Sequence, residues 1–106
     1  MDKSNHLVVY CTCPEEKTAE KIARALVTEG LAACANILPG VKSVYRWKGQ
    51  IESVNESLLL IKINSASYEN IERRIVELHP YELPEVIGVP ITAGLEPYLA
   101  WLTQPE

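Results

Sequence analysis

The 106 residues carry 47% hydrophobic and 23% charged side chains, a balance typical of a globular chain and not of a disordered one. Ten basic against fourteen acidic residues leave a net charge of −4 with no basic cluster for nucleic acid, and no apolar run reaches the ~20 residues of a membrane span. We therefore expect a single domain over residues 1–106, with no nucleic-acid partner and no membrane segment.

The first predicted element is a buried strand over residues 7–13, a β-branched apolar run that ends at Pro14. Thr12 and Glu15 have the spacing of a capping box, so a helix should follow. Gly30 is expected to end that helix. The inward stripe of the helix recurs at helical spacing and comprises Ala19, Ile22, Ala23, Leu26 and Val27.

A long β-hairpin is predicted next. Residues 31–38 form a strand that is broken at Pro39-Gly40 and resumes at residues 44–47, and Lys48-Gly49 is the expected turn. The third strand then runs over residues 50–63, which at ~3.3 Å per residue would span roughly 46 Å. A small domain cannot cover such a strand.

The last elements complete a recognisable order. A second helix is expected to start near Ser65 or Ser67 and to end before Pro80, and a strand over residues 86–91 follows, with Pro90 at a sheet edge or bulge. A short helix ends the chain. The order β-α-β-β-α-β predicts an α+β, ferredoxin-like sandwich, with an antiparallel four-stranded sheet and both helices on one face.

The overlong hairpin indicates a partner chain. Its polar half, residues 50–56, alternates polar and apolar side chains and leaves bare strand edges. Edge-to-edge pairing in a closed homo-oligomer protects such edges most simply. The alternative is a solvated, mobile hairpin.

The segment His79-Pro80-Tyr81-Glu82-Leu83-Pro84-Glu85 places a histidine, a tyrosine and carboxylates between two prolines that restrict the backbone. A constrained loop presents side chains at low entropic cost. The residues leave two interpretations open, a binding site or a rigid connector.

Together these patterns resemble the CutA divalent-cation tolerance proteins. The resemblance implies a homotrimer joined through sheet edges, similar in architecture to PII signalling proteins, with a role in tolerance of copper and other divalent metals. It rests on six ordered motifs, namely Cys11-Thr12-Cys13-Pro14, residues 31–40, Ser43-Val44-Tyr45-Arg46-Trp47-Lys48-Gly49, Lys62, residues 79–85 and Tyr98-Leu99-Ala100-Trp101-Leu102.

The resemblance also implies copper ligands, Cys11 and His79, although Leu78 stands where the family has a further histidine. Cys13 lies two positions from Cys11 on the same face of the strand and is the candidate third ligand for copper or another divalent ion. The alternative is that each cysteine, Cys34 above all, is a small core residue. No C-x-x-C or H-x-x-x-H spacing supports a structural zinc site.

A second hypothesis is a PII-like module that binds a small molecule. In a trimer, Tyr81 and Glu85 could meet Tyr45, Trp47 and Lys62 in clefts between chains, where aromatic rings and a cation suit a small anionic or amphipathic ligand. The same residues could simply pack an interface.

An enzyme is the weakest of the three hypotheses. Cys11 or Cys13 could act as a nucleophile with His79 as its base, but no hydrolase signature accompanies them. A non-enzymatic protein is expected. The odd cysteine count and the lack of a secretory leader further predict a reducing, cytoplasmic location.

Overall fold

The computed structural model describes residues 5–104. The expectation of no leader concerns residues 1–4, and the expected domain ends at residues 105–106, so both lie outside the described residues. Its elements are β1 (His6–Cys13), α1 (Glu16–Thr28), β2 (Cys34–Trp47), β3 (Gln50–Asn64), the 3-10 turn η1 (Ser65–Ser67), α2 (Tyr68–Leu78), β4 (Ile87–Pro90) and α3 (Glu96–Thr103). No helix in this part of the chain has the length and apolar character needed to cross a membrane.

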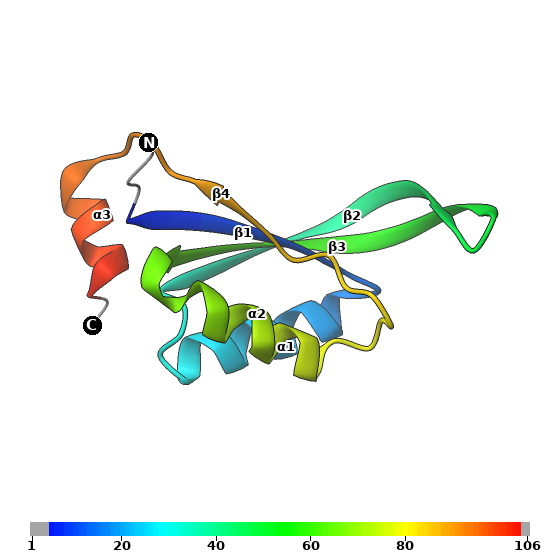
Figure 1. Ribbon diagram of the computed structural model, residues 1–106, viewed down its shortest axis with the longest axis horizontal. Helices are drawn as coiled ribbons and strands as arrows, with labels where there is room; N and C mark the ends of the chain where they lie inside the picture. Colours follow the sequence, from blue (N-terminus) through cyan, green and yellow to red (C-terminus); the bar gives the residue numbers. More distant parts are fainter. Residues whose placement is uncertain (1–4, 105–106) are drawn as a thin grey trace.

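The four strands form one antiparallel sheet in the order β2-β3-β1-β4. Helices α1 and α2 lie side by side against one face of this sheet, and α3 sits at the end where β1 begins (Figure 1). This arrangement is the ferredoxin-like βαββαβ fold with a long β2-β3 hairpin and a C-terminal helix, and it confirms the fold class predicted from the sequence.

The core lies between the sheet and the two long helices. Alternate residues of the central strands point into it, because successive side chains of a strand face opposite sides. The helices contribute residues spaced three and four apart. The fully buried set comprises Val9, Cys11, Cys13, Ala19, Ile22, Leu26, Leu59, Ile61, Ile63, Ile71 and Ile75. Two cysteines are therefore core residues at the end of β1.

Both ends of α1 can be compared with their predictions. Gly30 ends the helix with φ +76°, its N–H donating to the Val27 carbonyl while Leu31 N–H donates to Leu26, so the predicted glycine stop is confirmed. The predicted capping box is wrong. The N-cap residue is Glu15, with no side-chain cap bond, and the Thr12 hydroxyl donates instead to Glu85 at 3.4 Å.

The start of α2 lies where it was predicted, because Ser67 occupies the N-cap position, but the side chain of that serine makes no capping bond. Asn64 Oδ1 instead accepts the backbone N–H of Ala66 at 3.0 Å, and the chain passes through η1 before the helix begins. The side-chain oxygen of Asn64 satisfies the first free backbone N–H of this turn, that of Ala66, so no serine hydroxyl is needed for that N–H.

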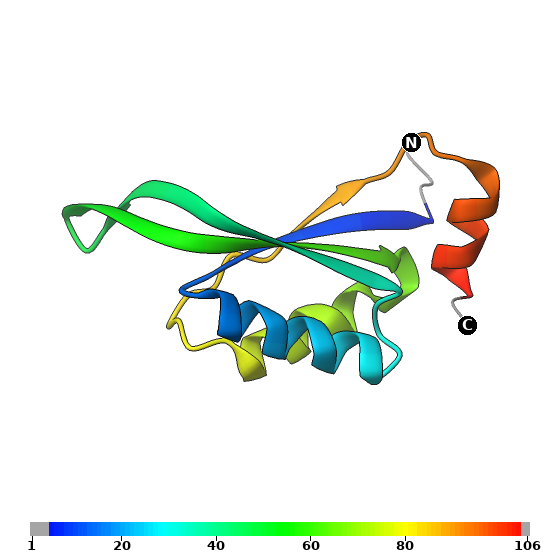
Figure 2. The same ribbon diagram turned by 180° about the vertical axis from the view of Figure 1, so that it is seen from behind.

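The hairpin projects well beyond the helices, as Figures 1 and 2 show. We call its outer part, residues 41–56, the arm. β2 is one continuous strand with a register shift between Leu38 and Val41, so Pro39-Gly40 produces a bulge and not the predicted break. Lys48 and Gly49 form the turn with φ of 51° and 81°, as predicted. The longest dimension of the molecule is 44 Å.

β4 is a short edge strand that pairs with β1 only over Leu7–Tyr10. Pro90 lies opposite Leu7 at this edge, where a residue without an N–H is tolerated, as predicted. Beyond Tyr10 no β4 residue pairs with β1, and the loop that connects α2 to β4 runs past that end of the strand (Figure 1).

Candidate functional site

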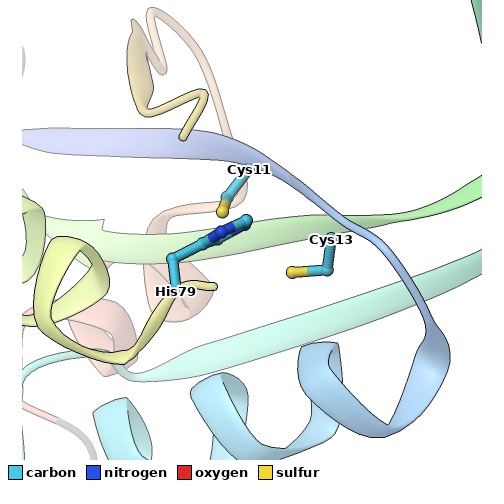
Figure 3. A group of neighbouring side chains, drawn as sticks. All are labelled: Cys11, Cys13 and His79. Atoms are coloured by element: carbon cyan, nitrogen blue, oxygen red, sulfur yellow. The ribbon is translucent and has the colours of Figure 1, made fainter. Parts of the chain in front are cut away.

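Two thiols and an imidazole converge at the end of β1. The ligand atoms of Cys11, Cys13 and His79 all lie within 4.8 Å of one another, and no other group of three or more potential ligand residues occurs among residues 5–104. Both cysteines are fully buried and His79 is 7% exposed. Figure 3 shows the sulfur atoms and the ring turned toward one another.

His79 owes its position to the proline that follows it. Pro80 excludes a helical conformation at His79, which adopts φ −80° and ψ 137° while its N–H still bonds to Ile75. This bend directs the ring at β1, where Nε2 lies 2.8 Å from the Thr12 carbonyl oxygen. The N–H of Tyr81 donates to Nδ1 at 3.1 Å.

These two contacts assign the tautomer of His79. A backbone N–H can only donate, so Nδ1 is the acceptor, and Nε2 must carry the proton that it donates to the Thr12 carbonyl. The neutral ring therefore has both nitrogens engaged. A metal ion could bind either nitrogen only after one of these hydrogen bonds had been given up.

The two thiols are electrostatically coupled. The hydrogen bond to Cys13, followed by burial, raises the pKa of the Cys11 thiol far above its ordinary value. The same hydrogen bond, opposed by burial and by Glu56, lowers the pKa of Cys13. Of the two thiols, Cys13 is therefore the one whose deprotonation its surroundings favour.

The donor set fits a soft metal ion. Thiolates and an imidazole select copper(I), zinc and similar ions, whereas carboxylates suit magnesium or calcium. Ligands bonded to one tetrahedral ion at ~2.3 Å lie roughly 3.8 Å apart, so the three groups would have to close by about 1 Å at most. Leu78 is half-buried against the core and offers no ligand atom. Cys34 lies on β2 opposite Lys62 and is not part of the cluster.

A cleft of about 740 Å³ lies beside the cluster, between the arm and the loop over residues 80–85. Four of the five residues predicted to share a pocket line it, and they do so within one chain, whereas the prediction placed the pocket between chains. The lining residues are Thr12, Ser43, Val44, Tyr45, Trp47, Glu56, Pro80, Tyr81, Glu82, Leu83 and Glu85.

Lys62, the fifth predicted pocket residue, lies elsewhere. It pairs with Val8 and Cys34 in the inner half of the sheet, and its Nζ is 5.9 Å from the centre of the Tyr98 ring. Six positions along β3 separate it from Glu56, which is roughly 20 Å of extended chain. Lys62 therefore does not line the cleft of its own chain, and its grouping with the other four residues stays a prediction about neighbouring chains.

Glu56 is a buried residue of the cleft that the sequence analysis did not include in the pocket. It is only 6% exposed, and its Oε2 accepts the hydroxyl of Tyr81 at 2.6 Å. Burial, with this hydrogen bond as the second cause, raises the pKa of Tyr81. The Tyr81 ring also packs on His79, with ring centres 4.7 Å apart, so the cleft and the cysteine cluster share a wall. The only sequence feature that could have pointed to Glu56 is its place in β3, where the polar half of the strand meets the apolar half.

Comparison with known proteins places these features in one family. Residues 7–105 match the family described as CutA1 divalent ion tolerance protein. The divalent-cation tolerance protein CutA of Thermus thermophilus is 45% identical over 97 residues, which cover 92% of this chain and 94% of that protein. The chloroplastic protein CutA of Arabidopsis thaliana is 45% identical over 96 residues, 91% of this chain, which spans 53% of that longer protein.

A solved structure is similar over nearly the whole fold. It is the divalent cation tolerance protein (Cut A1) of Thermus thermophilus, with a TM-score of 0.91 and 44% sequence identity. The superposition covers 93% of this chain and 96% of that chain.

Proposed function

Because the chain belongs to the CutA1 divalent ion tolerance family, we propose that it binds a soft metal ion, copper in the first place, through Cys11, Cys13 and His79. The observation that carries this proposal is the convergence of two thiols and an imidazole within 4.8 Å. The family is not a family of enzymes, and the fully buried thiols offer no surface to a substrate.

The proposed binding is weak compared with a dedicated metal site. His79 must exchange a hydrogen bond for the metal, and both thiols must lose protons inside the core. These costs suit a protein that responds to excess metal more than one that holds a permanent ion.

Titration of the reduced protein with copper(I), in competition with a chromophoric chelator under anaerobic conditions, tests the proposal. We expect Cys11→Ser, Cys13→Ser and His79→Gln each to weaken binding by at least about tenfold, because loss of one of three ligands leaves an incomplete shell. Cys34→Ser is the matched control and should bind as the wild type does. Equal affinity in all five proteins would remove these residues from the role.

We further propose a homotrimer that assembles through sheet edges. The arm extends beyond the protomer body, and its Val44 and Ile51 side chains are 67% and 63% exposed, which is unfavourable for a solitary chain (Figure 2). Native mass spectrometry and sedimentation at micromolar concentration test the subunit number. A monomer at that concentration would contradict the proposal.

A cytoplasmic location is proposed on the state of the cysteines. Cys11, Cys13 and Cys34 are free thiols, which a reducing compartment preserves. The name of the Arabidopsis relative places that protein in the chloroplast, so compartments differ within the family. Imaging of a fluorescent fusion, with fractionation of the native protein as its control, tests the location.

A further inference from the structure

We propose that the cleft between the arm and the loop over residues 80–85 binds an organic cation through its ammonium or guanidinium group. This inference concerns a different site from the cysteine cluster and does not depend on metal binding. The ligand charge differs from the one expected from the sequence, because no lysine, arginine or histidine lines the cleft within one chain.

The charged residues that line the cleft are all acidic. Glu56, Glu82 and Glu85 all line the cleft, and none of its lining residues is lysine, arginine or histidine. Lys48 at the tip of the arm pairs with one of these carboxylates, its Nζ lying 3.5 Å from Glu82. Both members of that pair are largely exposed, so it contributes little to neutralising the interior of the cleft.

Glu56 is the strongest single indication of a cationic ligand. Its carboxylate is nearly buried, yet its partner is a neutral hydroxyl, that of Tyr81, and it takes part in no ion pair among residues 5–104. A buried carboxylate without a cation is unfavourable unless a charged group compensates it. A ligand ammonium in the cleft would supply that compensation.

The aromatic walls favour an organic cation. Tyr45, Trp47 and Tyr81 line the same space, and the faces of such rings attract ammonium and guanidinium groups. The protein already uses one of these rings in this way, because Lys48 Nζ lies 5.6 Å from the centre of the Trp47 ring. Aromatic rings grouped with carboxylates are the residue types that bind alkylated ammonium ions in other proteins.

A metal ion does not fit the same residues. Among residues 5–104 no three carboxylates come close enough together to share an ion. Each cleft carboxylate instead has its own neighbour: the Tyr81 hydroxyl for Glu56, Lys48 for Glu82 and the Thr12 hydroxyl for Glu85. Dispersed negative charge complements a bulky, diffuse cation better than a small metal ion.

Two sources could supply the cationic group. One is a free small molecule, and the other is a lysine or arginine of a second copy of the chain, since Lys42 and Arg46 are exposed on the arm. The cleft recognises the same chemical group in both cases, so the experiment has one part for each source.

The first part of the experiment compares choline with its neutral isostere 3,3-dimethylbutan-1-ol. The protein contains two tryptophans, and only Trp47 lines the cleft, whereas Trp101 lies on α3. In ¹⁵N-labelled protein we expect choline to shift the Trp47 indole signal and to leave Trp101 unchanged. The neutral isostere should bind at least about tenfold more weakly, because it has the shape without the charge.

Variants of the cleft residues then test which side chains are responsible for the preference for a cation. Glu56→Gln should weaken choline binding about tenfold, and Trp47→Leu should do the same, followed through the backbone signal of Gly49. Glu20→Gln, which removes an exposed carboxylate on α1, is the control and should leave the affinity unchanged. Trp47→Leu keeps the test valid if Glu56→Gln does not fold.

The second part of the experiment measures subunit assembly. If a neighbouring copy supplies the cation, choline will not bind the assembled protein, and Glu56→Gln will shift its subunit equilibrium toward smaller species by sedimentation. Either result supports a cation site and identifies its source. Equal binding of choline and the alcohol, or no binding together with unaltered assembly of Glu56→Gln, would overturn the proposal.

Discussion

The Nε2 atom of His79 donates to the carbonyl oxygen of Thr12 across 2.8 Å, which ties the residue after α2 to the end of β1 that β4 leaves unpaired. The contact satisfies a strand-edge carbonyl with a side chain in place of a neighbouring strand. It also means that the candidate metal ligand has a structural task when no metal is present.

The first prediction follows from that task. His79→Ala should lower the free energy of unfolding of the metal-free protein by about 2–3 kcal/mol, since it removes two hydrogen bonds of a buried ring. Urea denaturation at one fixed protein concentration measures the change. His6→Ala, which removes the histidine at the opposite end of β1, should lose less than about 1 kcal/mol. A smaller loss at His79 than at His6 would refute the structural role.

A second prediction concerns the buried pair of Tyr81 and Glu56. Tyr81→Phe removes the hydroxyl that donates to Oε2 at 2.6 Å, and the unfolding free energy should fall by about 1–3 kcal/mol because the carboxylate loses its partner. In a double-mutant cycle with Glu56→Gln the two losses should not add, with a coupling of about 1 kcal/mol or more. Additive losses would show that the contact contributes nothing specific.

Local patterns predicted most of the fold. Alternating apolar residues gave the strands, helical spacing gave α1 and α2, and Gly30 and Gly49 marked their ends, because these signals depend only on neighbours in the chain. The N-cap prediction at Thr12 failed because Glu85, 73 positions away, takes the hydroxyl. A local rule cannot anticipate a partner that only the tertiary fold supplies.

The candidate site shows the same division. The common face of Cys11 and Cys13 follows from the period of a strand, so it could be predicted. The approach of His79 requires the path of the loop after α2, and the contact of Tyr81 with Glu56 joins residues 25 positions apart. Within one chain Lys62 lies six positions along β3 from Glu56, so its grouping with the cleft residues stays a prediction about neighbouring chains.

The glycine that ends α1 offers a third prediction. Gly30 has φ +76° and nothing within 4 Å of an added Cβ, so any effect of Gly30→Ala comes from backbone conformation alone. The unfolding free energy should drop by about 1 kcal/mol, and Gly30→Asn should drop less, because asparagine tolerates this region better. Thermal and urea denaturation of the three proteins provide the measurement. An unchanged Gly30→Ala variant would mean that the helix end relaxes into another turn.

A fourth prediction gives a pH dependence. Arg74 on α2 donates to Glu29 at 2.8 Å, and this hydrogen bond lowers the pKa of Glu29 below its ordinary value of 4.5. A carboxyl group whose pKa is depressed by folding stabilises the folded state above its ordinary pKa, and the contribution disappears as the pH falls through the lowered value. Stability should therefore decline with acidification below about pH 4.5, and less steeply in Glu29→Gln.

Urea midpoints measured across the acid range test that slope. Glu20→Gln, which breaks an exposed pair with Arg24 within α1, is the matched control and should keep the wild-type dependence, since pairs of that kind contribute little. An identical slope in Glu29→Gln and the wild type would remove the pair between α1 and α2 as a source of the acid sensitivity.

The last prediction separates assembly from folding. Val44 and Ile51 lie on the same face of the arm, because Val44 pairs with Ser53 and Arg46 pairs with Ile51. Both side chains are exposed in the protomer, so Val44→Lys and Ile51→Lys should leave the circular dichroism of an isolated chain unchanged. In a trimer that buries this face, each introduced charge would be desolvated and should shift the protein toward monomers by at least about tenfold in the association constant. Sedimentation measures that shift, and Val76→Lys, which places the same charge at an exposed apolar residue of α2 outside the arm, tests whether charge alone is responsible. Unaltered association of both lysine variants would mean that the arm faces solvent.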